Sequence, residues 1–168
     1  FYTYTLNHPQ YLKETYDNFF KYCNDYKSFE KTLYLNIDPY VENYITKKDK
    51  ETNIQKIKDI ADTYFDNVII RTPEKCDMTD GFYWAAEQIK SPQFFLLYCY
   101  ITHGGNCIKK EFSLNHICER LDKYNDVCQI CLMTNNSDYI EYLTCCPTLW
   151  KTDYIKNIYL ENGSKYVQ

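Results

Sequence analysis

The sequence predicts an α/β domain with a mainly parallel sheet and helices on both faces. Strand-like segments alternate with segments of helical periodicity along most of the chain, in the order β-α-β-α-β-α-β. The segment 93–100 is a continuous apolar run, which is typical of strands buried on both faces of a sheet. The chain also passes from a strand pattern to a helix pattern within its first ten residues, as many nucleotide-binding α/β folds do.

The first segment is the clearest of these units. Residues 2–6 alternate aromatic with aliphatic or β-branched side chains, which predicts a strand. An Asn-His-Pro turn ends it, and apolar residues then recur at helical spacing up to residue 20. Because ligands of open α/β sheets bind outside the carboxyl ends of the strands, we expect Thr5, Asn7 and His8 to face a ligand.

The later elements follow from the same periodicities, and Ser113 is expected to cap the helix that begins at residue 114. The polar segment 44–53 predicts an exposed loop. No repeat or linker interrupts the chain, so a single domain is expected over residues 1–168. The other expected elements are strands at 31–37, 68–71, 93–100, 127–133 and 139–144, helices at 54–64, 81–89, 114–124 and within 147–157, and turns or loops at 72–80, 102–106 and 135–138.

Composition narrows the function classes. The chain has 168 residues and a net charge of −4, which gives no electrostatic case for nucleic acid as a partner. No apolar run reaches the length of a membrane helix, and no signal-peptide pattern is present. The first residue, Phe1, lies inside a strand pattern and is not Met, so we expect upstream residues to be missing from this numbering.

The nine cysteines favour a reducing, cytoplasmic compartment, because their number is odd and no signal peptide precedes them. Cys128 and Cys131 have the spacing of metal ligands, and two further cysteines follow at 145–146. Residues three apart in a strand point to opposite faces, however, and the surrounding sequence is strand-like. Buried thiols are therefore expected rather than a structural zinc site.

Five segments of the chain resemble glycosyltransferases of the GT-A fold, close to the family 2 type. The first resembles the strand, turn and helix with which that family begins, and the last resembles its acceptor-side Pro-x-Leu-Trp-(Arg/Lys)-x-Asp pattern. The resemblance covers nearly the whole chain and implies a GT-A-like sheet that binds a nucleotide-sugar donor and transfers the sugar to an acceptor. The segments are YTYTLNHPQYLKETYDNFF, KTLYLNIDP, FDNVIIRTPEK, DGFYWAAEQIKSPQFFLL and CCPTLWKTDYIKN.

The resemblance implies nucleotide contacts at the ends of the first three strands, and each has a plainer alternative. Thr5 and Asn7 would contact the nucleobase, or else form a capping turn after the strand. Asp38 would accept a hydrogen bond from the ribose, or else be an ordinary turn residue before a proline. Arg71 would pair with a phosphate, or else form a surface salt bridge. Asp80 would contact the nucleotide-sugar, or else be the N-cap of the next helix.

The resemblance assigns catalysis and acceptor binding to two residues of the last segment. An inverting transfer needs a carboxylate that takes the proton of the acceptor hydroxyl, and Asp153 is the candidate for this catalytic base. Trp150 would stack on the acceptor sugar. The alternatives are that Trp150 belongs to the core and that Asp153 complements the dipole of a helix in its first turn.

The usual metal site of the family is missing. Members place two or three carboxylates after the strand that corresponds to 93–100, where they hold Mg²⁺ or Mn²⁺. Here positions 98–100 read Tyr-Cys-Tyr, and the next acid is Glu111. No metal ligand is therefore assigned, and metal dependence is expected to be reduced or absent. His103, beside two glycines, would supply positive charge instead, or else be a solvated turn residue.

Three hypotheses about function remain open from the sequence. The first is a glycosyltransferase that uses Asp153 as base. The second is a catalytically silent GT-A relative that acts as a binding or assembly module. The third is another nucleotide-binding α/β module that is not a transferase.

Overall fold

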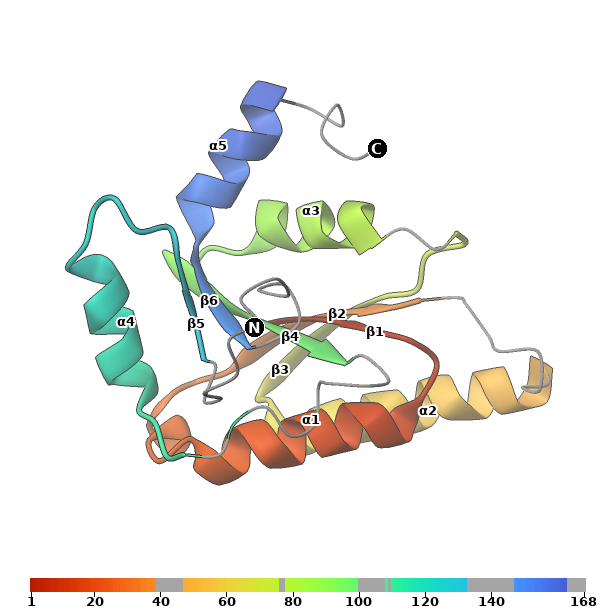
Figure 1. The fold of residues 1–168 in the computed structure, drawn as a ribbon. Coiled ribbons are helices and arrows are strands. Elements are labelled where there is room, and N and C mark those ends of the chain that lie inside the picture. Colours follow the sequence, from red (N-terminus) through yellow and green to blue (C-terminus); the bar gives the residue numbers. More distant parts are fainter. Residues whose placement is uncertain (39–46, 76–77, 100–107, 109, 133–146, 163–168) are drawn as a thin grey trace, which may run out of the picture.

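The computed structural model describes residues 1–38, 47–75, 78–99, 108, 110–132 and 147–162 (Figure 1). A central sheet lies between two layers of helices. In chain order the elements are β1 (Tyr2–Thr5), α1 (Pro9–Tyr22), the 3₁₀-helix η1 (Tyr26–Ser28), β2 (Thr32–Ile37), α2 (Lys47–Tyr64), β3 (Asn67–Arg71), α3 (Met78–Gln88), β4 (Gln93–Cys99), α4 (Leu114–Asp122), β5 (Gln129–Cys131), β6 (Thr148–Lys151) and α5 (Thr152–Asn162).

The sheet has six strands in the order β3-β2-β1-β4-β6-β5. β1 pairs in parallel with both β2 and β4, and β2 pairs in parallel with β3. β6 runs antiparallel to both of its neighbours, β4 and β5. The predicted α/β class is confirmed, while the sheet itself is mixed because β6 is reversed.

Helices cover both faces of the sheet, as predicted. α1, α2 and α4 pack on one face, and α3 and α5 pack on the other (Figure 1). Side chains of a strand alternate between faces, so Leu33, Leu35 and Ile37 of β2 point into the larger core while Tyr34 contacts the α3 side. The larger core also contains Leu12, Tyr16, Phe19 and Phe20 of α1, Ile57 and Ala61 of α2, and Ile117 and Leu121 of α4.

Three predicted boundaries are wrong. The expected loop at 44–53 is helical from Lys47 onward, because the polar first turns of α2 are held by tertiary hydrogen bonds rather than by an apolar stripe. The expected loop at 72–80 ends earlier, since α3 starts at Met78. The segment expected only to lead into a helix contains a strand, β6, before α5 begins.

The remaining elements agree with the prediction where the structure describes them, although β5 is shorter than the expected strand at 127–133. The turns expected at 102–106 and 135–138 and the strand at 139–144 lie outside the described residues. No helix in the part of the chain that the structure describes is both long enough and apolar enough to cross a membrane.

The first turn of α4 is stabilised by a residue that is distant in sequence. Ser113 caps the helix as predicted, because its Oγ accepts the backbone N–H of His116 at 3.1 Å. Asp25, which follows α1, accepts hydrogen bonds from the backbone N–H of Leu114 at 2.8 Å and from the Ser113 hydroxyl at 2.7 Å. Burial opposes ionisation of the Asp25 carboxyl, but these hydrogen bonds outweigh it and lower its pKa below the ordinary 3.8.

Candidate functional site

The strand order of the sheet switches direction at β1. The chain leaves β1 toward β2 on one side, whereas the strand on the other side of β1 is β4. Such a switch point in strand order is where ligands bind in open α/β sheets, outside the carboxyl ends of the strands. A ligand site is therefore expected at the carboxyl edge of this sheet.

Five of the predicted site residues lie at this edge. Thr5 ends β1, Asp38 follows β2, and Arg71 ends β3. Asn7 lies in the turn between β1 and α1, and Asp80 lies in the first turn of α3. The backbone N–H of Asp38 donates to the carbonyl oxygen of Thr5 at 2.8 Å, which holds the ends of β1 and β2 together. The structure thus gathers residues that are 75 positions apart in sequence on one edge.

Asn7 joins the turn after β1 to the helix α2. Its Nδ2 donates to the carbonyl oxygen of Lys50 at 3.3 Å, and its own carbonyl oxygen accepts Nδ2 of Asn53 at 3.2 Å. The side chain is completely buried, and its Oδ1 has no hydrogen-bond partner among the described residues. Asn7 therefore has the structural role of a turn residue and also retains one buried acceptor. The Thr5 hydroxyl donates locally, to the carbonyl oxygen of Leu6 at 2.9 Å.

A row of polar residues crosses the sheet on its α3 side. Tyr4 of β1 is in register with Asn36 of β2, and Asn36 is in register with Arg71 of β3. Asn36 is completely buried, and neither Oδ1 nor Nδ2 of its amide has a hydrogen-bond partner in the described ranges. Burying an unsatisfied amide costs free energy, so its place beneath α3 is a specific feature of this edge.

Arg71 is held by α3. Its Nη2 forms an ion pair with Oδ2 of Asp80, and its guanidinium carbon lies 5.8 Å from the centre of the Trp84 ring. Its Nη1 is buried and has no hydrogen-bond partner among the residues described. The salt-bridge alternative for Arg71 is therefore what the structure contains. The N-cap alternative for Asp80 is wrong, because Asp80 is the third residue of α3.

Three helices begin at the same edge. α1 follows β1, α2 comes after β2, and α3 comes after β3, so each helix starts at the carboxyl end of a parallel strand. Their starts lie toward one side of the molecule (Figure 1). Helix N-termini present unpaired N–H groups and partial positive charge, which favours an anionic ligand at this edge.

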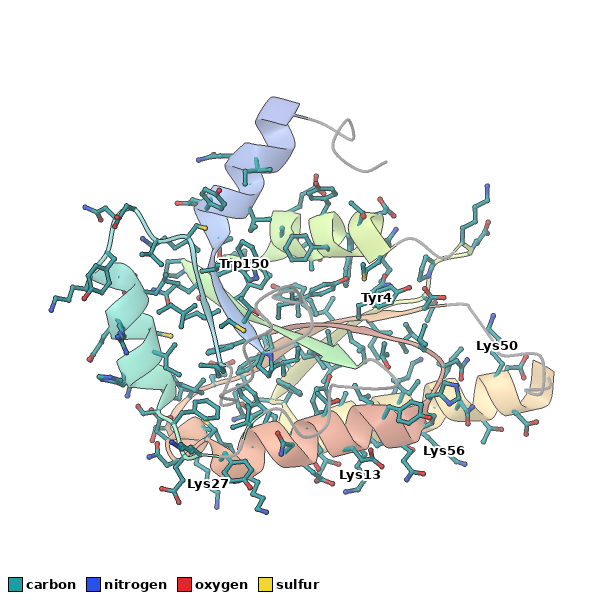
Figure 2. All side chains as sticks on the ribbon, in the orientation of Figure 1. Tyr4, Lys13, Lys27, Lys50, Lys56 and Trp150 are labelled. Atoms are coloured by element: carbon teal, nitrogen blue, oxygen red, sulfur yellow. The ribbon has the colours of Figure 1, made fainter. Side chains whose placement is uncertain are left out.

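Asp153 and Trp150 lie at the other edge of the sheet. Because β6 is reversed, Lys151 is in register with Gln93 at the amino end of β4. The next residue, Thr152, donates its N–H to the carbonyl oxygen of Pro92 at 2.8 Å, which starts α5 there. Figure 2 shows Trp150 toward one end of the sheet and Tyr4 toward the other. The length of β4 separates the edges, about 20 Å for a strand of seven residues.

The surroundings of these two residues match their plainer alternatives. Trp150 is half-buried against the smaller core, in register with Phe94, and its indole N–H has no hydrogen-bond partner within the described part of the chain. Asp153 is exposed in the first turn of α5. The structure does not bring either residue to the carboxyl edge.

No metal centre is present among the described residues, since no three of their His, Cys, Asp or Glu side chains lie together in a way that could hold an ion. His103 and Cys145–Cys146 lie outside those residues. Of the four cysteines whose side chains the structure describes, only Cys23 is buried, so the expectation of buried thiols is wrong for the partly exposed Cys118, Cys128 and Cys131. Burial raises the pKa of the Cys23 thiol to about 12 and that of Cys118 to about 11.

Sequence analysis missed three residues of this edge. Asn53 lies in the segment 44–53 that is expected to be a loop, and no local pattern marks Trp84. Asn36 did leave a signal, because it is a polar residue inside the otherwise apolar strand segment TLYLNI. Its position on the α3 side follows from alternation, but its contact with α3 does not.

A comparison with known proteins finds no matching family model, no matching curated protein and no matching solved structure. The case for a site therefore depends on the geometry of this chain. That geometry consists of buried polar side chains, the guanidinium of Arg71 and three helix starts at the carboxyl edge.

Proposed function

We propose that this chain binds the nucleotide part of a nucleotide-sugar at the carboxyl edge of its sheet and transfers the sugar to an acceptor, as a glycosyltransferase-like domain. One observation carries the proposal: Thr5, Asn7, Asp38 and Arg71 all lie at the carboxyl edge of the parallel strands β1, β2 and β3, and the strand order switches at β1. Two of them, Asn7 and Asp38, are completely buried. Buried polar groups away from the core of a fold are characteristic of binding sites.

Each residue of this edge has a chemical role in the proposal. Asp38 offers a carboxylate to the ribose hydroxyls, and Oδ1 of Asn7 accepts a donor group of the base. Arg71 pairs with a phosphate, and the starts of α1 and α2 add positive potential for the diphosphate. Asp80 acts indirectly, because its ion pair with Arg71 occupies part of the guanidinium.

The sheet supports the comparison with GT-A glycosyltransferases. The resemblance implies a mainly parallel sheet, and three of the five strand pairings here are parallel. Fold alone does not establish activity, so the proposal depends on the residues of the site. The site supports nucleotide binding more strongly than it supports transfer.

The base for sugar transfer remains a prediction. A general base must lie within hydrogen-bond reach of the hydroxyl that it deprotonates, about 3 Å. Asp153 is one strand length away from the proposed nucleotide site. Binding of the nucleotide does not require Asp153, and the stacking role of Trp150 likewise stays a prediction.

The second candidate function is a catalytically silent GT-A relative that serves as a binding or assembly module. The distance of Asp153 from the carboxyl edge favours it, and so does the sequence Tyr-Cys-Tyr at 98–100 in place of metal-binding acids. Both candidates share the nucleotide site. They differ in whether a bound nucleotide-sugar is turned over.

Isothermal titration with UDP, GDP, CDP and ADP, each with and without Mn²⁺, tests the proposal. We expect saturable binding of at least one nucleoside diphosphate and at least tenfold weaker binding by Asp38→Asn, because a charged hydrogen-bond acceptor is lost. Asp62→Asn is the control, since Asp62 is exposed on α2. Failure of all four nucleotides to bind would reject the proposal. Release of sugar from the matching nucleotide-sugar then separates a transferase from a silent relative.

A further inference from the structure

We propose that Asp80 is a built-in competitor for the anionic ligand of Arg71, so that it weakens the binding of a nucleotide diphosphate. This inference rests on the proposed function and refines it. It replaces the expected direct contact between Asp80 and the ligand with an opposing effect.

The geometry places a carboxylate where a phosphate would bind. Asp80 pairs with Nη2 of Arg71, and Trp84, four residues later on α3, lies 5.8 Å from the guanidinium carbon. Residues four apart share one helix face, so α3 holds both partners of Arg71. A guanidinium binds carboxylates and phosphates through the same planar fork of N–H donors. An incoming phosphate must therefore displace Asp80 to use both sides of that fork.

The unequal exposure of the pair makes displacement feasible. The side chain of Asp80 is 60% exposed, whereas that of Arg71 is 24% exposed. Arg71 lies against Trp84 and is the less exposed partner, so the pair opens by movement of the more exposed Asp80. Exposed ion pairs are weak, so the expected penalty on ligand affinity is small, about two- to fivefold.

The charge of Asp80 also acts on the helix itself. Asp80 lies in the first turn of α3, where a carboxylate neutralises the partial positive charge of the N-terminus. Without this carboxylate, both Arg71 and the positive potential of the helix N-terminus would be available to an anion. A positioning role for Asp80 predicts the opposite result, since loss of the partner would loosen Arg71 and weaken binding.

The experiment compares the unmodified chain with Asp80→Asn and Glu87→Gln. Glu87 is exposed on the same helix, so Glu87→Gln removes one negative charge from α3 without touching Arg71. Dissociation constants are measured for pyrophosphate and for UDP at low and high salt. We expect Asp80→Asn to bind both ligands about two- to fivefold more tightly than the other two proteins, with a smaller gain at high salt. Arg71→Gln combined with Asp80→Asn should abolish the gain.

The outcomes separate this inference from the proposed function. Tighter pyrophosphate binding by Asp80→Asn, with no binding of UDP, GDP, CDP or ADP, supports the competitor and rejects the nucleotide site. UDP binding that is unchanged or weaker in Asp80→Asn overturns the competitor and leaves the nucleotide site in place. Absence of pyrophosphate binding in every protein overturns the inference. Thermal melting verifies folding, and Asp80→Ser, which suits the first turn of a helix, replaces a variant that does not fold.

Discussion

The side-chain amide of Asn36 lies so close to Gly81 that a Cβ added to this glycine would come within 2.8 Å of Asn36 Cγ. This contact fixes the first turn of α3 over the carboxyl end of β2. Asp80 precedes Gly81, and Arg71 is in register with Asn36. The approach of Gly81 to Asn36 therefore sets the position of the Arg71–Asp80 ion pair.

Gly81→Ala should destabilise the protein by about 1–3 kcal/mol, because the buried amide of Asn36 has to move to admit the methyl group. The expected sign is informative, since replacing glycine by alanine inside an open helix stabilises it by about 1 kcal/mol. Urea denaturation of the two proteins measures the difference. A stabilised Gly81→Ala protein would show that the two residues are not in close contact.

A second variant identifies the cause. In the background of Asn36→Ser, which removes the crowded amide, the cost of Gly81→Ala should fall or change sign. The coupling between the two substitutions is read from a double-mutant cycle. Strictly additive effects would contradict the proposed clash.

Asp25→Asn should destabilise the protein by about 1–2 kcal/mol at pH 7, because α4 loses acceptors for its first N–H groups. The pKa of Asp25 is lower in the folded protein than its ordinary 3.8. The stabilisation is therefore complete above this value and is lost as the pH falls below it, through the folded pKa. Urea denaturation at pH 7 and at pH 3 should show a smaller difference between the two proteins at pH 3.

The control for this prediction is Asp126→Asn. Asp126 is exposed after α4, so its replacement should change the free energy of unfolding by less than about 0.5 kcal/mol at either pH. An equal loss from both variants would mean that net charge, rather than the cap on α4, causes the effect.

Among the described cysteines, Cys128 and Cys131 should react with iodoacetamide at pH 8 well before Cys23 and Cys118. Burial holds the thiol pKa near 12 for Cys23 and near 11 for Cys118, so their reactive thiolate fractions at pH 8 are small. Peptide mass spectrometry after timed alkylation gives the order. The denatured chain is the control, in which these four named cysteines should react alike. Equally fast modification of Cys23 in the folded protein would contradict its burial.

Much of the fold was predictable because its elements carry their own periodicity. The alternation from Tyr2 to Leu6 and the helical spacing from Tyr11 to Phe20 each specify an element locally. The first turns of α2 have no such pattern, and they depend on bonds from Asn7 and Asn53 to groups far along the chain. Tertiary hydrogen bonds of this kind cannot be predicted from the local sequence.

Of the proposed site, only the grouping of the carboxyl-edge residues could be predicted from the sequence. Thr5 and Arg71 end parallel strands, Asn7 and Asp38 follow such strands, and parallel strands bring their carboxyl ends to one edge. The position of Asp153 depends on the direction of β6, which four residues do not encode. Reversal of that strand moves Asp153 to the opposite edge, although its sequence motif is intact.

The most direct test of the proposed nucleotide site is to map where UDP, or whichever nucleoside diphosphate binds, changes the backbone amide NMR signals of the ¹⁵N-labelled chain. We expect the largest saturable changes at the carboxyl edge, at Thr5, Asn7, Asp38 and Arg71, and little change at Gln93 and Asp153. Changes that cluster around Gln93 and Asp153 at the amino end of β4, or no saturable change at all, would contradict the account.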